Sequence, residues 1–164
     1  MIVFKGEDME KLHRKVREHL THRKEILLAA EKLFAAKGFF PTTMSEIARE
    51  AQFGTGTLYK YFKSKEDLYF TLIEEKTAEI NGSVKGELSK RMSAIERIEK
   101  ILRIQFEFIE RNRDFFRIYV SERSRFEWTV KDDLGKGLHE KMVAYIHLLA
   151  QVMKQGTKDG TFKP

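Results

Sequence analysis

Proline constrains the fold of this chain most strongly, because only two prolines occur, Pro41 and Pro164. Proline ends or kinks an α-helix, so its scarcity leaves long stretches free to be helical. The 10 glycines are also few for 164 residues, and good helix formers such as Lys, Glu, Arg, Leu and Ala fill the stretches between them. We therefore predict an all-α chain without a large β-sheet.

Composition excludes several classes of protein. The chain has no cysteine, which rules out disulfides, zinc sites built on thiolates and cysteine nucleophiles. No stretch reaches the ~18 consecutive apolar residues of a membrane-spanning helix, and the start MIVFKGEDMEKL does not have the pattern of a signal peptide. We expect a cytoplasmic protein that does not contact a membrane.

Positive charge is concentrated in the first 65 residues. This part contains 13 Lys and Arg against 8 Asp and Glu, whereas the remainder contains 18 against 17. A basic part joined to a nearly neutral one favours a polyanionic partner for the first part, with nucleic acid as the leading candidate. Ordinary surface charge gives similar numbers, so charge alone does not decide between the two interpretations.

The spacing of apolar residues predicts three helices in this basic part. The first spans residues 21–37 and ends at Gly38. The second begins at a capping box in which the side chains of Thr43 and Glu46 each bond the other's backbone amide. A three-residue turn, 52–54, separates it from a third helix of about two turns with the sequence TGTLYKYF. This arrangement is typical of a helix-turn-helix, whose second helix enters the DNA major groove.

The third helix carries more polar groups than a buried helix could satisfy. Hydroxyls, phenols and an ammonium can bond phosphates or base edges, and a glycine lets the backbone approach DNA closely. Leu58 and Phe62, four residues apart, are expected to pin the helix to the domain. The expected DNA-facing residues of this helix are Thr55, Gly56, Thr57, Tyr59, Lys60 and Tyr61. Thr43 and Lys65 each lie in the first turn of a helix, where the helix dipole favours a phosphate.

A fourth helix is predicted to begin at the capping signal formed by Ser64 and Asp67 and to run towards Ile80. Residues 81–86 contain two glycines and are expected to break this helix. We interpret that break as the boundary region between two functional halves.

Three further helices are expected in the second half. The first opens at Ser93, the second begins at Asp114, and the third runs from Gly135 to Gly156. The predicted buried face of the first of these helices consists of Ile95, Ile98, Leu102, Gln105 and Ile109.

The segment from Arg23 to Leu68, with the stretches GFFPTTMSEIAREA and TGTLYKYFKSKEDL, closely resembles the N-terminal domain of the tetracycline-repressor (TetR) family of bacterial and archaeal transcription regulators. The resemblance implies a three-helix helix-turn-helix DNA-binding domain followed by a C-terminal helical domain for ligand binding and dimerisation. It also implies a homodimer that reads a palindromic operator on double-stranded DNA. A small-molecule effector is then expected to control the affinity for that operator.

By position, the resemblance assigns DNA contacts to the third-helix residues named above and phosphate contacts to Thr43 and Lys65. Ser45 lies where some relatives have a base-reading residue. The sequence departs from the family pattern at Gln52, where the turn usually has Gly, and at Gly54, where it often has Ser. Gln52 is therefore expected to adopt a left-handed backbone conformation, and Gly54 to cap the third helix without a side-chain bond.

We expect a basic N-terminal extension at residues 1–20, the DNA-binding domain at 21–67 and the effector-binding and dimerisation domain at 68–164. The extension is either a basic helix or arm that adds phosphate contacts or a solvated continuation of the first helix. Residues 155–164 resemble the loop that in relatives precedes a final helix pair. The dimer is accordingly expected either to use another surface or to use a helix pair beyond residue 164.

Large apolar side chains in the second domain are suited to line a pocket for an apolar effector. The candidates are Phe106, Phe115, Tyr119, Trp128, Met142 and Tyr145. His19 and His22 could share a helix face but lack a third ligand, so neither a metal nor a cofactor is expected. No phosphate loop, nucleophile elbow or HExxH motif supports an enzyme.

Together these features predict a DNA-binding transcriptional regulator, in the first instance a dimeric repressor released from a palindromic operator by a small, apolar effector. One alternative is a helical small-molecule-binding protein whose DNA binding is not controlled by an effector, and another is a helical enzyme. Only the first predicts that an effector releases a specific operator, and the enzyme predicts no salt-sensitive DNA binding.

Overall fold

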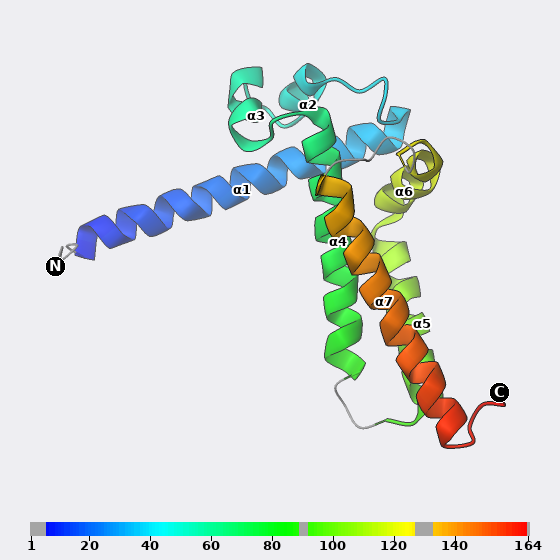
Figure 1. Cartoon of the computed structure of the whole chain (residues 1–164). Helices are drawn as coiled ribbons and strands as arrows, with labels where there is room; N and C mark the ends of the chain where they lie inside the picture. The colour runs from blue at the N-terminus through cyan, green and yellow to red at the C-terminus, as the bar shows by residue number, and fades with distance from the viewer. Residues whose placement is uncertain (1–5, 89–91, 127–132, 164) are drawn as a thin grey trace. The chain divides into compact units, whose positions relative to one another are not determined.

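The computed structural model describes residues 6–88, 92–126 and 133–163, and in this part of the chain α-helices are joined by short turns, without strands. The helices are α1 (Gly6–Lys37), α2 (Met44–Glu50), α3 (Thr55–Tyr61), α4 (Lys65–Leu88), α5 (Ala94–Arg111), α6 (Arg113–Phe126) and α7 (Asp133–Lys158) (Figure 1). The predicted all-α fold is confirmed. Among the described residues, no helix combines the length and apolar character that crossing a bilayer requires.

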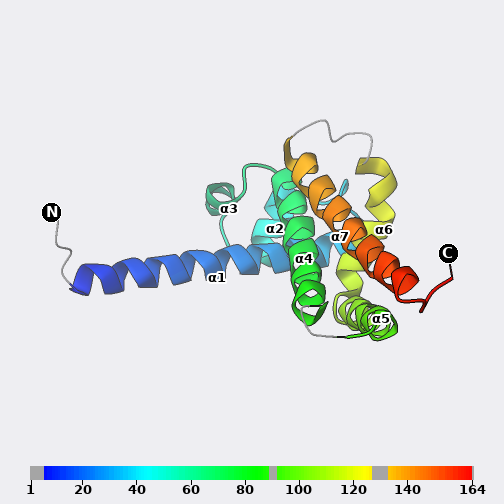
Figure 2. The ribbon, with the colours of Figure 1, turned by 60° about the horizontal axis from the view of Figure 1, so that its bottom comes forward.

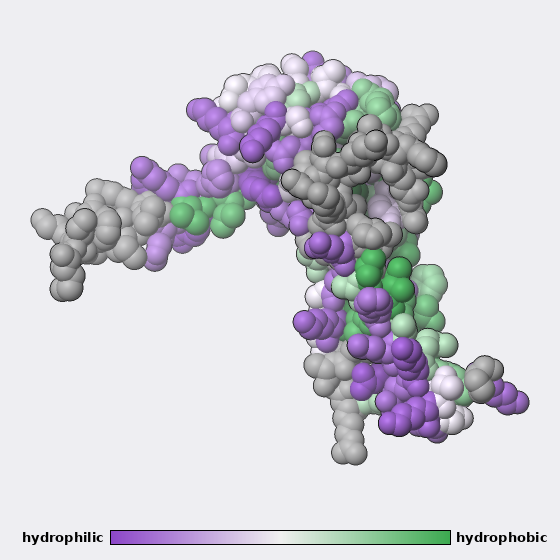
Figure 3. All heavy atoms as spheres, in the orientation of Figure 1, coloured by the Kyte–Doolittle hydropathy of each residue, from purple (hydrophilic) through white to green (hydrophobic). Residues whose placement is uncertain are grey.

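The chain divides into two compact units, Met1–Leu68 and Tyr69–Pro164. In the first unit α2 packs against both α1 and α3. Its core contains Ile26, Ala30 and Phe34 of α1, which recur four residues apart and so lie on one face of the helix, as the apolar spacing predicted. On the side drawn in Figure 3, the surface of this unit is mostly hydrophilic.

α1 is one continuous helix, and its first half extends well before the predicted start at residue 21. Residues 13–20 are all exposed, so no buried stripe marks them in the sequence. An i,i+4 ion pair joins Arg14 Nε to Glu18 Oε1 at 3.6 Å. From Gly6 onward, the predicted N-terminal extension is therefore a helical continuation of the first predicted helix.

α4 does not break at residues 81–86, and that prediction was wrong. Gly82 and Gly86 each weaken a helix by about 1 kcal/mol relative to Ala. Between them, however, Val84 is completely buried and forms a core cluster with Ile101 of α5 and Val152 of α7. Burial of such a side chain contributes about 1.5–3 kcal/mol, which offsets the weak helix propensity of the glycines.

Only part of the predicted buried face of α5 faces inward, namely Ile98, which packs against the core cluster, and the half-buried Gln105. Ala94, Ile101 and Phe108 are buried, whereas Ile95, Leu102 and Ile109 are exposed. Both sets follow the same helical spacing, so periodicity could not decide which one faces the core. α5 packs against α6 and α7, and Figure 2 shows α5 and α7 side by side.

The sequence predicted that Gly156 ends the last helix, and this was wrong. Gly156 is buried within α7, which continues to Lys158. A side chain at this position would collide with Phe162, which folds back so that its backbone amide donates to the Gly156 carbonyl at 2.9 Å. Gly160, with φ of 77°, follows the last turn in the left-handed conformation that commonly ends a helix.

Candidate nucleic-acid interface and ligand cavity

The turn between α2 and α3 has the conformation that the sequence predicted. Gln52 has φ of 60°, a left-handed conformation that a non-glycine residue rarely adopts. Its neighbour Phe53 donates its backbone amide to the Ala48 carbonyl at 2.8 Å, which holds the turn against the end of α2. Gly54 caps α3 without a side-chain hydrogen bond.

α3 has one buried and one open side. Leu58 is 0% exposed, and Phe62 just after the helix is 2% exposed, so this pair anchors α3 as predicted. Tyr59 is 52% exposed, and Thr55, Gly56 and Lys60 are exposed as well, while Thr57 is half-buried. The open side therefore presents a hydroxyl, a bare backbone segment, a phenol and an ammonium within seven residues.

Tyr61 does not belong to this open side, although the sequence pattern placed it there. Its ring stacks on His19 at 4.6 Å between centroids, and its phenolic oxygen lies 3.0 Å from Nδ1 of His22. Tyr61 is three residues after Leu58 and so lies on the side of α3 that faces the domain. The phenol of Tyr61 therefore interacts with His22 of the same unit.

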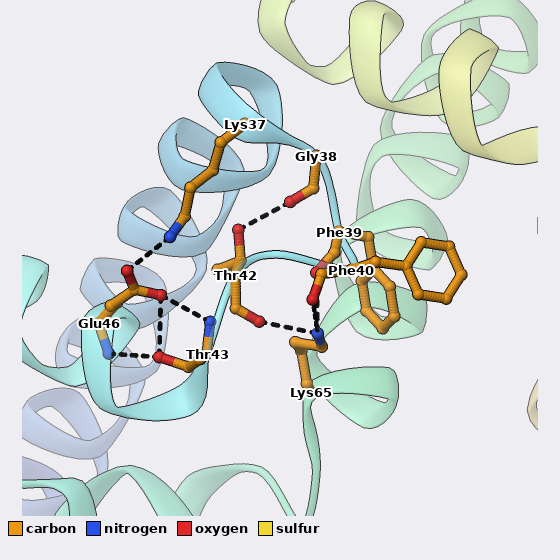
Figure 4. Close-up of polar contacts among 8 residues, drawn as sticks. All are labelled: Lys37, Gly38, Phe39, Phe40, Thr42, Thr43, Glu46 and Lys65. Atoms are coloured by element: carbon orange, nitrogen blue, oxygen red, sulfur yellow. Dashed lines mark hydrogen bonds and ion pairs between the residues drawn. The ribbon is translucent and has the colours of Figure 1, made fainter.

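The start of α2 is fixed by the predicted capping box, which Figure 4 shows in detail. The Glu46 amide donates to Thr43 Oγ1 at 3.2 Å, and the Thr43 amide and hydroxyl both donate to Glu46 Oε2 at 2.9 Å. Lys37 Nζ donates to Glu46 Oε1 at 2.5 Å. The hydrogen bond from Lys37 and those from Thr43 lower the pKa of Glu46 to about 2. Thr43 and Ser45 are both exposed.

The ammonium of Lys65, for which the sequence predicted a phosphate contact, is directed into the domain. Nζ donates to the carbonyl oxygens of Phe39 at 2.8 Å, Phe40 at 3.1 Å and Thr42 at 2.7 Å (Figure 4). It also lies 4.3 Å from the centroid of the Phe39 ring, within range of a cation–π contact. An ammonium has three donors, so these bonds satisfy it and tie the first turn of α4 to the segment before α2.

The second unit contains a cavity of about 140 Å³ with a mostly apolar lining. Three of the residues predicted for an effector pocket line it, namely Phe115, Tyr119 and Tyr145. Phe106 does not, because it is 68% exposed on α5. Trp128 lies outside the described residues, as does the side chain of Met142. The full lining is Lys76, Thr77, Ile80, Asn81, Gln105, Phe108, Phe115, Phe116, Tyr119 and Tyr145.

Apart from the predicted Tyr145, the polar groups at the cavity come from residues that the sequence pattern did not assign to it. Lys76 Nζ donates to Asn112 Oδ1 at 2.5 Å, and the Gln105 amide donates to the Tyr145 phenol. Burial raises the pKa of Tyr145, and the hydrogen bond from Gln105 opposes this only in part. The phenol therefore keeps its proton at neutral pH and can donate it to a further acceptor. A polar Gln105 among apolar positions of α5 was the one available signal for this group.

A short helix anchored by Leu58 and Phe62, with an exposed polar side and a tight turn before it, defines a helix-turn-helix protein of the DNA-binding class. Residues 26–72 match the family of bacterial regulatory proteins described as the tetR family. Residues 26–72 are therefore a DNA-binding domain of this family. Proteins that are similar over most of the chain are named as transcriptional regulators.

Similarity to individual members extends beyond the DNA-binding domain. The fatty acid metabolism regulator protein of Bacillus subtilis is 23% identical over 139 residues, which cover 85% of this chain and 70% of the relative. The transcriptional repressor KstR2 of Mycolicibacterium smegmatis is 26% identical over 144 residues, covering 88% and 69%. The solved structure of the ketosteroid transcriptional regulator KstR2 of Mycobacterium tuberculosis has a TM-score of 0.76 at 25% identity, over 87% of this chain and 71% of that one.

Proposed function

We propose that the protein is a homodimeric transcriptional repressor, which binds a palindromic operator through α3 and is released by a small, largely apolar effector. The observation that carries the proposal is the open side of α3. Thr55, Tyr59 and Lys60 are exposed there, while Leu58 is fully buried. The polar groups of such a helix are accessible to base edges, and its buried residue fixes its position in the domain. Insertion into a major groove requires both.

The start of α2 supplies further contacts in this proposal. Thr43 and Ser45 are exposed at the N-terminus of that helix, where the helix dipole favours a phosphate. They position the domain on the duplex, while Thr55, Tyr59 and Lys60 contact base edges and flanking phosphates. Lys65 acts here as a positioning residue, because it holds the segment from which α2 begins.

The cavity sets the size of the effector. An apolar cavity of about 150 Å³ accommodates a molecule the size of benzene, and this one has about 140 Å³. The Tyr145 phenol and the Lys76 ammonium are both hydrogen-bond donors, so they suit a carbonyl or carboxylate oxygen. We therefore propose an effector that carries a short acyl group of about six heavy atoms. Relatives named for fatty acid metabolism and for ketosteroids support an apolar effector.

α4 offers a route from effector to operator, because one helix contributes to both units. Its first residue, Lys65, bonds the segment before α2. Three and four turns later, Lys76 and Ile80 line the cavity. We infer that a ligand that displaces Lys76 or Ile80 acts on this shared helix and thereby changes operator affinity.

The homodimer is supported by an exposed apolar face on α5. Ile95, Leu102 and Phe106 are 51%, 46% and 68% exposed, which is unusual for side chains of this kind on one helix. A second copy that covers this face gives a two-fold symmetric assembly, and its operator is then an inverted repeat.

The test is a selection of duplexes from a random library by the purified protein, followed by sequencing. We expect enrichment of an inverted repeat whose half-sites are about 34–36 Å apart. Lys60→Ala should lose the enrichment while retaining the thermal stability of the native chain. Absence of enrichment, or equal enrichment by Lys60→Ala, would refute the proposal for α3.

A second measurement addresses the effector. Hexanoate and its coenzyme A thioester are added to the complex with the enriched duplex, and release is followed by fluorescence anisotropy. We expect release by at least one of them, with Tyr145→Phe requiring more ligand. If the duplex is bound specifically but neither compound nor its longer homologues release it, DNA binding is not controlled by an acyl effector.

A further inference from the structure

We propose that the N-terminal half of α1 forms a second DNA-contact surface, in which Lys15 binds a backbone phosphate outside the base pairs that α3 reads. The proposal rests on the DNA binding proposed for α3 and extends it to a part of the chain that the helix-turn-helix does not include.

The contact between α3 and α1 shows which face of α1 is turned towards the recognition helix. Tyr61 of α3 stacks on His19 and lies within hydrogen-bonding distance of His22. His22 also meets the ring of Phe53, in the turn before α3, at 5.0 Å between centroids. The face of α1 that carries His19 and His22 is therefore the face against which the helix-turn-helix packs.

Lys15 continues this same face outward. It precedes His19 by four residues, so its side chain leaves the helix in nearly the same direction, one turn farther from the domain. Arg17 precedes His19 by two residues and is directed to the opposite side. Both side chains are exposed. The helix thus offers one basic residue towards the side of α3 and one of equal charge away from it.

The length of this segment matches the reach that flanking phosphates require. Figures 1 and 2 both show α1 continuing past α3 at its N-terminal end. From Gly6 to Glu18 the helix rises about 20 Å, and one strand of a duplex presents about six phosphates over that distance. The Arg14–Glu18 ion pair neutralises a neighbouring charge on this stretch, so Lys15 is the cation that we assign to DNA.

Residues 13–18 of this segment have no buried side chain that would stabilise the helix. The side chains at 13–20 are all exposed, and an isolated helix of this length is marginal in water. Attraction between the Lys15 ammonium and a neighbouring DNA phosphate would stabilise this part of the helix. Val16 and Leu20, which are 50% and 59% exposed, offer a competing explanation, namely an apolar protein partner. Leu20 is five residues from Lys15 and so lies towards the other side of the helix.

The experiment compares Lys15→Gln with Arg17→Gln, two variants that remove the same charge from opposite faces of one helix. Affinity for a fluorescein-labelled random-sequence duplex of about three helical turns is measured by anisotropy between about 50 and 200 mM KCl. We expect Lys15→Gln to lower the affinity about three- to ten-fold at low salt. The slope of log affinity against log salt should become shallower by about 0.9 for each phosphate that the protein no longer neutralises. Arg17→Gln should leave both quantities within two-fold of the native chain, a limit of about 0.4 kcal/mol.

Equal effects of the two substitutions, or no effect of either, would overturn the proposal, because the face of α1 would then be irrelevant. Weaker DNA binding with Val16→Ser and Leu20→Ser but not with Lys15→Gln would also overturn it, because the apolar side chains of α1, and not its lysine, would then carry the contact. Lys60→Ala separates this failure from failure of the proposed function. If the native chain binds DNA and Lys60→Ala weakens it, DNA binding by α3 stands whatever the outcome at Lys15. Circular dichroism of each variant verifies that α1 remains helical.

Discussion

The phenolic oxygen of Tyr61 lies 3.0 Å from Nδ1 of His22, and this interaction joins the end of α3 to the middle of α1. Two residues earlier, Tyr59 carries the same phenol on the exposed side of α3. The two side chains are chemically identical but have different surroundings, because residues two positions apart lie on different sides of a helix. Tyr61 contacts α1, whereas Tyr59 is exposed.

Removal of each phenol oxygen should therefore have opposite consequences. Tyr61→Phe removes a half-buried hydrogen bond and should lower the free energy of unfolding by about 0.5–1.5 kcal/mol, with DNA affinity nearly unchanged. Tyr59→Phe should leave the thermal midpoint unchanged and weaken DNA binding. Calorimetry and anisotropy on both variants provide the measurement. An unchanged midpoint for Tyr61→Phe would show that its hydrogen bond with His22 contributes nothing.

Lys65→Met tests whether Lys65 positions the domain or binds phosphate. Removal of the hydrogen bonds to three carbonyl oxygens should destabilise the first unit by about 1–2 kcal/mol, since the ammonium is only partly shielded from water. DNA affinity should fall without a change in salt slope. A slope that becomes shallower by about 0.9 would instead assign Lys65 to a phosphate. Lys63→Met, at an exposed lysine two residues earlier, is the matched control.

Gln52→Gly should stabilise the protein. A left-handed conformation costs a non-glycine residue about 1–2 kcal/mol, and the greater freedom of glycine in the unfolded chain offsets part of the gain. The expected net increase in unfolding free energy is about 0.5–1 kcal/mol, measured by urea denaturation. Gln52→Ala is the control, and an equal gain from alanine would contradict an explanation based on backbone strain.

Glu46 should confer a pH dependence on stability. Its pKa falls from 4.5 to about 2 in the folded protein, so its contribution is complete above pH 4.5 and is lost as the pH falls towards 2. Glu46→Gln should accordingly lower the thermal midpoint at pH 7, and the difference from the native chain should shrink over this interval. A difference that persists unchanged at pH 2 would exclude the carboxylate as its source.

Local signals in the sequence were sufficient for much of the fold. The capping boxes at Thr43 and Ser93, the left-handed Gln52 and the anchoring pair Leu58 and Phe62 were all found where the pattern predicted. Each of these features depends on residues within a few positions of one another. The chemistry of neighbouring residues decides them, so no knowledge of the tertiary arrangement was needed.

Features decided by distant residues could not be predicted in this way. The partners of Lys65 lie 23 to 26 residues earlier, and no local pattern announces them. On α5 two apolar stripes compete, and only the neighbouring helices select Ile101 and Phe108 over Leu102 and Ile109. The cavity combines residues of four helices, so Lys76 and Asn81 could be assigned to it only once those helices were placed.

The two glycines that fail to break α4 still affect how that helix opens. A Cβ at Gly82 or Gly86 would meet no other atom within 4 Å, so neither position is required to be empty by packing. The final turns of α4 combine poor intrinsic helicity with one deeply buried anchor, Val84. Amide protons there should exchange with deuterium earlier than those near Leu72, which makes this end of the helix the place where partial unwinding begins.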